Sequence, residues 1–345
     1  MTPEKWKLLV HCARGGETET PLVGLIVDSP WIPGHLGIST FDYVTLPEVW
    51  FEANLAIERE FPDVIFLPGF WAEVGMATEP SGFGCKFRFS ANSPPSVLPV
   101  ICNPRELGGL EVPNPLTDGL MPFVLNFYRR MKSRINAEGH VIKMVAARGP
   151  LTVASHLLGV TGFLECMKLD GTATHDLLRI TTALVKDWLH AQAEAAGDVE
   201  GILVLDDISG MMGPKDYLEF AHPYLKEVFD AFPGAIKMFH NDTDNTVPYR
   251  YLAGLGIDLF NFTHLQPLSK VRTLVGNDIC LVGNVPPLEV LAQGTQQDVA
   301  ASAAECLRQH PARKRFILSA GGGTSPGTPG DNIRALVAAA RRHGL

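Results

Sequence analysis

Four residues whose side chains bind metals or move protons follow two neighbouring apolar runs of the sequence. Asp206 and Asp207 come directly after one run, and His240 and Asp242 follow the next. Each run is short enough to be a buried strand. Because neighbouring parallel strands end at the same edge of a sheet, carboxylate oxygens and an imidazole nitrogen can converge there on one metal ion. A zinc ion held by three such ligands, with one open position, acts as a Lewis acid.

Each of these residues also has a purely structural interpretation. A histidine after an apolar run is often a hydrogen-bonded residue of the core or rim, and Asp206 or Asp207 can cap a helix or pair with Arg148. Asp242 either orients His240 or is itself a ligand. The residue types alone leave these alternatives open.

Other apolar runs also end in polar residues, which predicts that several functional side chains share one rim. Arg148 can orient a carboxylate, and His264 is either a second acid/base group or a simple rim residue. Asn284 either fixes a bound polar group or belongs to a turn. The last run is followed by three consecutive glycines, Gly321, Gly322 and Gly323. Their backbone N–H groups can bind phosphate or carboxylate.

The elements that must position these residues are strands and helices in alternation. Eight apolar runs are typical of buried strands, at 22–27, 64–67, 141–146, 201–205, 236–239, 259–262, 279–282 and 315–318. Most are separated by segments with apolar residues at three- and four-residue steps, most clearly 174–196. This alternation predicts an α/β protein, a (β/α)8 TIM barrel that occupies residues 1–345 as a single domain. A doubly wound sheet is the alternative.

The segment 69–126 interrupts this alternation, since it is rich in Gly, Pro and Ser. So long an irregular stretch inside a compact domain is usually a functional loop or lid. Residues 86–89 alternate between polar and aromatic side chains, which indicates a small hairpin within it.

The composition limits the possible partners and compartments. A formal net charge of −8 and the lack of a basic cluster argue against a nucleic-acid partner. The six cysteines are scattered without a CxxC pair, which favours reduced, buried thiols. No run approaches the roughly 20 apolar residues of a membrane span, and no secretory signal is visible, so we expect a cytoplasmic protein. Both a monomer and a homodimer remain open.

Motifs spread over nearly the whole chain carry a resemblance to a known family. They lie at 147–150 (Ala-Arg-Gly-Pro), 205–208, 217–224, 240–242 (His-Asn-Asp), 256–258, 283–287 (Gly-Asn-Val-Pro-Pro) and 318–323. Together they resemble the uroporphyrinogen decarboxylase superfamily, and most closely its corrinoid-dependent methyltransferase branch. The resemblance implies a barrel whose open end either decarboxylates a tetrapyrrole or meets a separate corrinoid protein.

Two departures from the family's motifs bear on the substrate. The decarboxylases grip substrate carboxylates with an arginine-rich motif near the amino terminus, whereas residues 27–34 contain no arginine here. The methyltransferases that act on coenzyme M bind zinc through His-x-Cys and a distant cysteine. Here Asp242 takes the place of the first cysteine, and Gly322 or Gly323 that of the second. The missing arginine motif therefore argues against a tetra-anionic substrate, and the missing cysteines argue against a thiol substrate.

Methyltransferases that act on methoxylated compounds are similar in another respect. Their zinc motif consists of two acidic residues and a histidine, with twenty residues between the second acid and the histidine. Glu219 and His240 have this spacing. The resemblance therefore implies that Asp206, Glu219 and His240 bind zinc, if the loop after Asp206 is shorter than the family's and the helix with Glu219 enters near the rim.

We therefore expect a zinc-dependent methyltransferase that moves a methyl group from a small methoxy or methylamine-type donor to the cobalt of a corrinoid on a partner protein. The expected catalytic residues are Asp206, His240 and Asp242. The expected contacts to substrate or corrinoid are Arg148, Asp207, His264, Asn284, Gly321, Gly322 and Gly323. One alternative is a decarboxylase in which Asp28 or Asp206 stabilises a protonated pyrrole, and another is a non-catalytic corrinoid-binding barrel.

Overall fold

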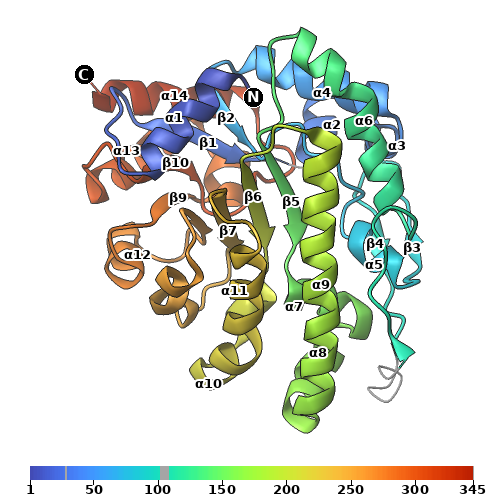
Figure 1. Cartoon of the computed structure of the whole chain (residues 1–345). Coiled ribbons are helices and arrows are strands. Elements are labelled where there is room, and N and C mark those ends of the chain that lie inside the picture. Colours follow the sequence, from blue (N-terminus) through green and yellow to red (C-terminus); the bar gives the residue numbers. More distant parts are fainter. Residues whose placement is uncertain (28, 102–108, 345) are drawn as a thin grey trace.

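Eight parallel strands form the wall of a barrel, in the order β2-β1-β10-β9-β8-β7-β6-β5 (Figure 1). The computed structural model describes residues 1–27, 29–101 and 109–344. The strands are β1 (Leu22–Ile26), β2 (Val64–Leu67), β5 (Met144–Arg148), β6 (Gly201–Leu205), β7 (Ile236–Asn241), β8 (Leu259–Phe262), β9 (Cys280–Val285) and β10 (Phe316–Ala320). Each overlaps one of the predicted runs. The predicted (β/α)8 barrel is therefore confirmed, in place of the doubly wound alternative.

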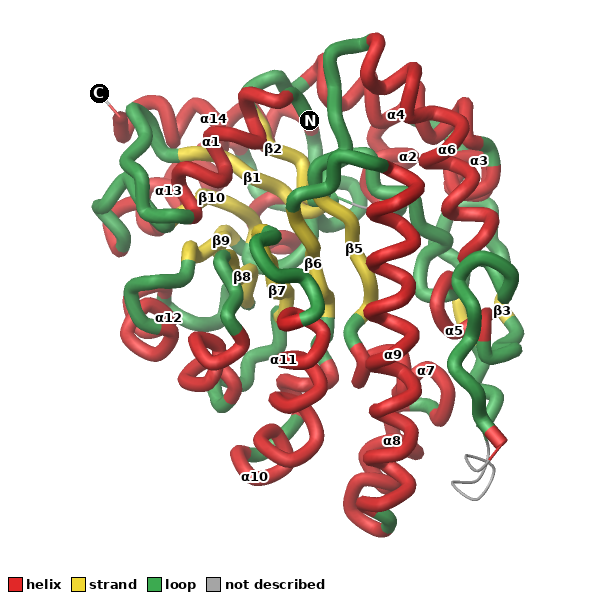
Figure 2. Tube along the Cα trace, in the orientation of Figure 1, coloured by secondary structure: helices red, strands yellow, loops and turns green. Residues whose placement is uncertain are grey.

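Helices surround this wall (Figure 2). The α-helices are α1 (Pro3–Ala13), α2 (Trp31–Leu36), α3 (Thr40–Thr45), α4 (Pro47–Glu60), α5 (Thr78–Gly82), α6 (Met121–Ala137), α7 (Pro150–Leu158), α8 (Val160–Leu169), α9 (Gly171–Ala196), α10 (Pro214–Asp216), α11 (His222–Asp230), α12 (Leu268–Val275), α13 (Gln296–Gln309) and α14 (Gly330–Gly344). Short 3-10 helices occur at η2 (Ile208–Met211) and η4 (Pro248–Leu255), and π-helical segments at η3 (Tyr217–Ala221) and η5 (Pro287–Ala292).

The longest helix, α9, shows how the sequence sets these boundaries. Leu177, Leu184 and Trp188 lie on its buried stripe, as the apolar spacing predicted. The Asp170 side chain accepts a hydrogen bond from a first-turn backbone N–H group, and Gly197 (φ +66°) ends the helix in a conformation that favours glycine.

The helical segment over 214–230 contains a π-helical turn, η3, between α10 and α11. Pro223 has no backbone N–H group and so cannot bond to the carbonyl of Glu219, four residues earlier. The N–H group of His222 bonds instead to the carbonyl of Tyr217, five residues earlier. The helical face that carries Glu219 is rotated as a result.

Side chains along each strand point alternately into the barrel and toward the helices. Met144, Leu203 and Met238 belong to the interior cluster, which α1 closes at the amino-terminal ends of the strands. Val204 and Phe239, one residue further along their strands, belong to the cluster between strands and helices. A strand-end residue therefore faces the barrel mouth only if it lies an even number of residues after an interior one.

The barrel wall has one seam. Among the residues that the structure describes, no backbone ladder joins β2 to β5. Part of the segment 69–126 lies beside this seam, and it contains α5 and an antiparallel hairpin of β3 (Phe87–Arg88) and β4 (Ser96–Val97). The predicted hairpin is therefore confirmed. Backbone N–H groups of Val100 and Ile101 donate to the carbonyl of Leu157, which attaches this segment to α7.

Five of the six cysteines lie in the described ranges, and all five are buried free thiols, as predicted. The sixth, Cys102, falls outside those ranges. Within the same ranges, every helix is too short or too polar to cross a membrane.

Candidate active site

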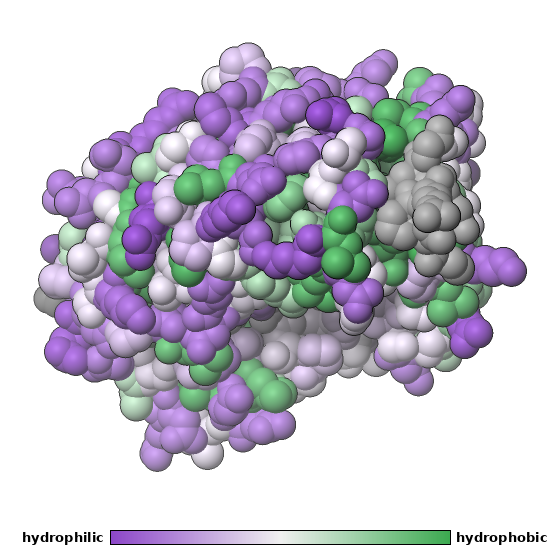
Figure 3. Space-filling view, turned by 90° about the horizontal axis from the view of Figure 1, so that it is seen from below, coloured by the Kyte–Doolittle hydropathy of each residue, from purple (hydrophilic) through white to green (hydrophobic). Residues whose placement is uncertain are grey.

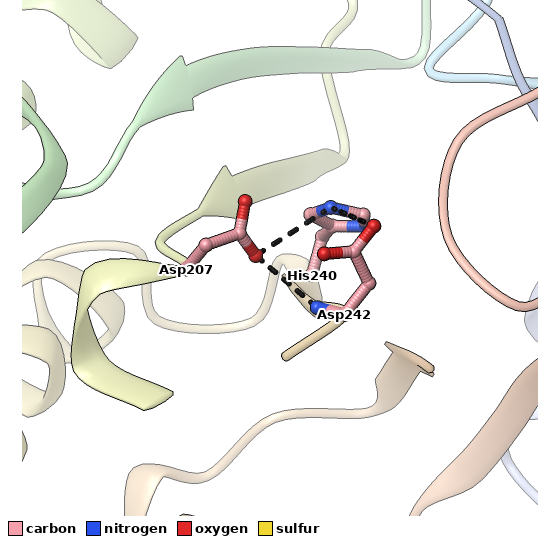
Figure 4. A group of neighbouring side chains, drawn as sticks. All are labelled: Asp207, His240 and Asp242. Atoms are coloured by element: carbon pink, nitrogen blue, oxygen red, sulfur yellow. Dashed lines mark hydrogen bonds and ion pairs between the residues drawn. The ribbon is translucent and has the colours of Figure 1, made fainter. Parts of the chain in front are cut away.

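Asp207, His240 and Asp242 come together at the carboxyl ends of β6 and β7 (Figure 4). His240 Nε2 lies 3.8 Å from Asp207 Oδ1 and 3.9 Å from Asp242 Oδ2. One ligand atom from each residue lies within 4.8 Å of the other two. The backbone N–H of Asp242 donates to Asp207 Oδ1 at 3.1 Å, which holds the two carboxylates beside the imidazole.

The alternation of the strands explains why these three residues meet. Leu203 and Leu205 face the barrel interior, so the next residue in this series, Asp207, faces the mouth. Met238 is an interior residue, and His240 and Asp242 continue its series. The intervening residues on both strands point outward, toward the helices.

The electrostatics of this group favour a bound cation. The side chains of Asp207 and Asp242 are 44% and 43% exposed, whereas His240 is 7% exposed. Burial raises the pKa of Asp242; the nearby charge of Asp207 raises it further, while His240 lowers it. Two carboxylates and one imidazole form a donor set that suits a divalent metal, which would relieve the repulsion between the acids.

Asn261 on β8 is a site residue that the sequence patterns did not single out. It is fully buried, and its Oδ1 lies 2.7 Å from His240 Nδ1. The signal for it was a single polar residue inside the apolar run 259–262. A buried amide in a strand must have hydrogen-bond partners, so such a residue marks a polar contact inside the barrel.

Asp206, predicted as a metal ligand, points outward to the amino terminus of α7. Its Oδ2 accepts from the backbone N–H of Leu151 at 2.9 Å, and its Oδ1 accepts from Thr152 Oγ1 at 3.2 Å. A Cβ on Gly149 would lie 2.3 Å from Asp206 Oδ2, so a glycine there leaves room for this contact. Burial raises the pKa of Asp206 to about 7, although hydrogen bonds from backbone N–H groups oppose the shift. Asp206 therefore stabilises the start of a helix.

Glu219, the other predicted acidic ligand, lies on the π-helical segment η3. Its Oε1 is 3.9 Å from Nε2 of His175 on α9, and its side chain is 43% exposed. The Nδ1 atom of His175 shares a hydrogen bond of 2.7 Å with the Tyr224 hydroxyl group. The structure thus places Glu219 with His175, and it does not bring Asp206, Glu219 and His240 together.

Arg148 points into the barrel mouth but is engaged with the segment 69–126. Its Nη2 donates to Glu73 Oε2 at 2.8 Å, and its backbone N–H donates to Glu79 Oε1 at 2.9 Å. The guanidinium also lies over the Trp71 ring, 4.9 Å from its centroid. Burial raises the pKa of Glu79, and the charge of Arg148 opposes the rise. Arg148 and its partners thereby connect the end of β5 to the loop after β2, across the seam.

His264 lies in the rim loop after β8, and Asn284 lies near the end of the neighbouring strand β9. His264 Nε2 is 3.8 Å from Glu289 Oε2 on η5. The amide of Asn284 donates to the carbonyls of Thr263 and Gln266, at 3.3 and 2.8 Å. Asn284 therefore holds the rim loop that carries His264.

The three glycines after β10 occupy different environments. A Cβ on Gly321 would lie 2.5 Å from the backbone nitrogen of His264, and one on Gly322 would lie 2.6 Å from Asp242 Oδ2. Gly322 also has φ +123°, whereas a Cβ on Gly323 would meet no atom within 4 Å. The lack of a side chain at Gly322 therefore leaves room for the Asp242 carboxylate. Asp28, the alternative acid of the decarboxylase hypothesis, lies outside the described residues.

The chain is similar to both methyltransferases and decarboxylases. A methylated-thiol–coenzyme M methyltransferase from Methanosarcina mazei is 25% identical over 268 residues, which cover 77% of this chain and 70% of that protein. A uroporphyrinogen decarboxylase from a Synechococcus species is 26% identical over 361 residues, which cover 97% of this chain and 96% of that protein.

A solved structure shares the fold, and a family model shows the family. A methyltransferase from Methanosarcina mazei has the same fold, with a TM-score of 0.81 at 22% identity over 97% of both chains. The model of the uroporphyrinogen decarboxylase (URO-D) family matches residues 35–343. Since this match covers most of the chain, the protein belongs to the uroporphyrinogen decarboxylase family.

Proposed function

We propose that this protein is a zinc-dependent methyltransferase, which moves a methyl group from a small methylated donor to the cobalt of a corrinoid carried by a partner protein. The observation that carries the proposal is the group of Asp207, His240 and Asp242 at the barrel mouth. A relative that is named as a methyltransferase supports the reaction class.

The donor set fits zinc and suggests the kind of leaving atom. Asp207, His240 and Asp242 would supply three ligands, which is the number that leaves a position for substrate in catalytic zinc sites. When bound, zinc would supply Lewis acidity that weakens the bond between the methyl group and its leaving atom. Because Asp207 and Asp242 provide hard oxygen ligands, the site suits an oxygen or nitrogen leaving atom better than a thiolate. The proposed donors are therefore methoxy or methylamine-type compounds.

The other predicted site residues take supporting roles in this proposal. His264 and the loop of Gly321, Gly322 and Gly323 border the mouth, where we assign them contacts with substrate or corrinoid. We propose that the segment 69–126 is a lid. The buried pair of Arg148 with Glu73 attaches this segment to β5, so Arg148 acts on the site through the segment.

Exposed apolar side chains surround the mouth and support a protein partner. Met211, Leu218, Leu265 and Leu288 lie on the segments that follow β6, β8 and β9, and each is at least 46% exposed. Figure 3 looks onto this end of the molecule, where apolar patches lie among polar side chains. A small methyl donor cannot cover four exposed side chains on three separate segments, whereas a docked corrinoid protein would bury them.

Metal analysis of purified variants tests the proposal directly. Wild-type protein should contain close to one zinc per chain, and His240→Ala and Asp207→Asn should each lose it. Glu219→Gln should retain zinc, because Glu219 lies with His175. Zinc loss in Glu219→Gln with retention in Asp207→Asn would instead favour the Asp206, Glu219 and His240 set. Methyl transfer by the metal-free protein would refute the zinc mechanism.

Two enzyme assays separate the remaining functions. Transfer from methoxy or methylamine donors to free cob(I)alamin is expected to be detectable, and Leu265→Ser should impair transfer to the corrinoid protein more than transfer to free cobalamin. Incubation with uroporphyrinogen should give no decarboxylated product, since residues 27–34 lack arginine. Product formation there would support the decarboxylase, and cobalamin binding without transfer from any donor would support the non-catalytic barrel.

A further inference from the structure

One buried amide links four strands of the barrel beneath the metal-binding group. Asn261 lies on β8 with no exposed surface, and its Oδ1 is 2.7 Å from His240 Nδ1 on β7. Its Nδ2 donates to the carbonyls of Val282 on β9 and Ala320 on β10, at 2.8 and 3.1 Å. Both amide hydrogens and the amide oxygen are therefore used.

These contacts determine which way the amide faces. Backbone carbonyls only accept hydrogen bonds, so the NH2 group of Asn261 must face Val282 and Ala320. The amide oxygen then faces His240, and it too only accepts. The proton in this hydrogen bond consequently resides on Nδ1 of His240. In the neutral imidazole, Nε2 then carries the lone pair that faces Asp207 and Asp242.

We propose that Asn261 is a positioning residue, which fixes the Nδ1-protonated tautomer and the ring orientation of His240 so that Nε2 is available as a ligand. The role of Asn261 in zinc binding rests on the proposed function. The tautomer of His240 follows from the hydrogen bonds alone. Hydrogen-bond partners of this kind orient metal-binding histidines and raise their basicity. An asparagine that only tied strands together would need its two donor bonds but no contact with His240.

The tautomer is measurable in the protein without metal. Nitrogen-15 spectra of histidine-labelled protein, with His240 assigned from its loss in His240→Gln, should show a protonated Nδ1 in the wild type. Asn261→Leu removes the acceptor and should shift His240 toward the Nε2-protonated form. Asn261→Asp retains an acceptor oxygen for Nδ1 and should keep the wild-type tautomer, although it loses the two donor bonds to Val282 and Ala320 and should lower stability.

Zinc affinity provides the second measurement, with a matched control. Asn261→Leu should bind zinc about 10- to 100-fold more weakly than wild type, as other losses of such partners do. Asn332 is also buried, and its amide donates to two backbone carbonyls, Leu291 and Gly294, both at 2.9 Å. Asn332→Leu therefore removes two donor bonds of the same kind, but at a place without contact to His240. It should leave both the tautomer of His240 and the zinc affinity unchanged.

The outcomes distinguish this inference from the proposed function. An Nε2-protonated His240 in the wild type, or unchanged zinc affinity in Asn261→Leu, would overturn the positioning role. Equal losses in Asn261→Leu and Asn332→Leu would also overturn it, since they would reflect lost packing alone. If the wild type shows the Nδ1 tautomer but binds no zinc, the proposed function fails and the positioning role stands.

Discussion

Replacement of Gly322 by alanine should displace Asp242 from the proposed metal site. The new Cβ would lie 2.6 Å from Asp242 Oδ2, whereas ordinary contact begins at 3.4 Å, so one of the two groups must move by roughly 0.8 Å. Metal sites tolerate deviations of only about 0.2 Å in ligand distance, so a shift of this size removes a ligand. We expect zinc to bind at least about 100-fold more weakly, which corresponds to roughly 2.7 kcal/mol. The positive φ adds strain that lowers the free energy of unfolding by about 1–3 kcal/mol.

Competition with a chromophoric chelator measures this affinity, and urea unfolding measures the strain. Gly323→Ala is the matched control, because its new methyl group meets no atom within 4 Å. It should bind zinc like the wild type. Wild-type affinity in Gly322→Ala, or an equal loss in Gly323→Ala, would refute the assignment of Asp242 as a ligand whose place depends on Gly322.

Three further predictions follow from buried groups. Asp206→Asn should lower the free energy of unfolding by about 1–3 kcal/mol, because an amide offers one acceptor oxygen where both carboxylate oxygens accept at the start of α7, yet zinc content should persist; loss of zinc would return Asp206 to the ligand set. Burial and the charge of Arg148 lower the pKa of His156 from 6.5 to about 4, so protonation favours the unfolded chain and stability falls as the pH drops through this window. The free energy of unfolding should decrease by roughly 2 kcal/mol between pH 7.5 and 5, and His156→Gln should remove that part of the decrease; an identical pH profile would contradict the assignment. Leu203→Ala, inside the barrel, should cost about 2–5 kcal/mol in urea unfolding, whereas Leu169→Ala, at a side chain that is 85% exposed, should change stability by less than about 0.5 kcal/mol; similar costs for both would contradict the assigned interior.

The sequence was sufficient to predict the barrel but not the orientation of each strand-end residue. Parallel strands buried on both faces are apolar at every position, so the period of two that separates inward from outward residues is hidden. Asp206 and Asp207 therefore looked equivalent, although only Asp207 continues the inward series of Leu203 and Leu205. The alternation became visible only once the two packing layers were distinguished.

The remaining differences have equally specific physical causes. The spacing from Glu219 to His240 counts residues along the chain, but the π-helical turn at Pro223 and the outward position of the helix direct Glu219 to His175. Asn261 was missed because the predicted site residues, Glu219 apart, were sought after the ends of the apolar runs, whereas Asn261 lies inside the run 259–262. Arg148 ends β5, but its buried partner Glu73 lies in an irregular segment whose path no periodicity predicts.

The contacts across the seam also form a continuous chain from the segment 69–126 to the proposed metal site. Glu79 holds the last residue of β5, Arg148, from which the chain passes directly into α7. The start of α7 is held by Asp206, and Asp206 is bonded covalently to Asp207. We therefore expect order in the segment and occupancy of the proposed metal site to be coupled through these contacts. By thermodynamic reciprocity, a donor that orders the segment would tighten metal binding by the same factor by which the metal tightens donor binding.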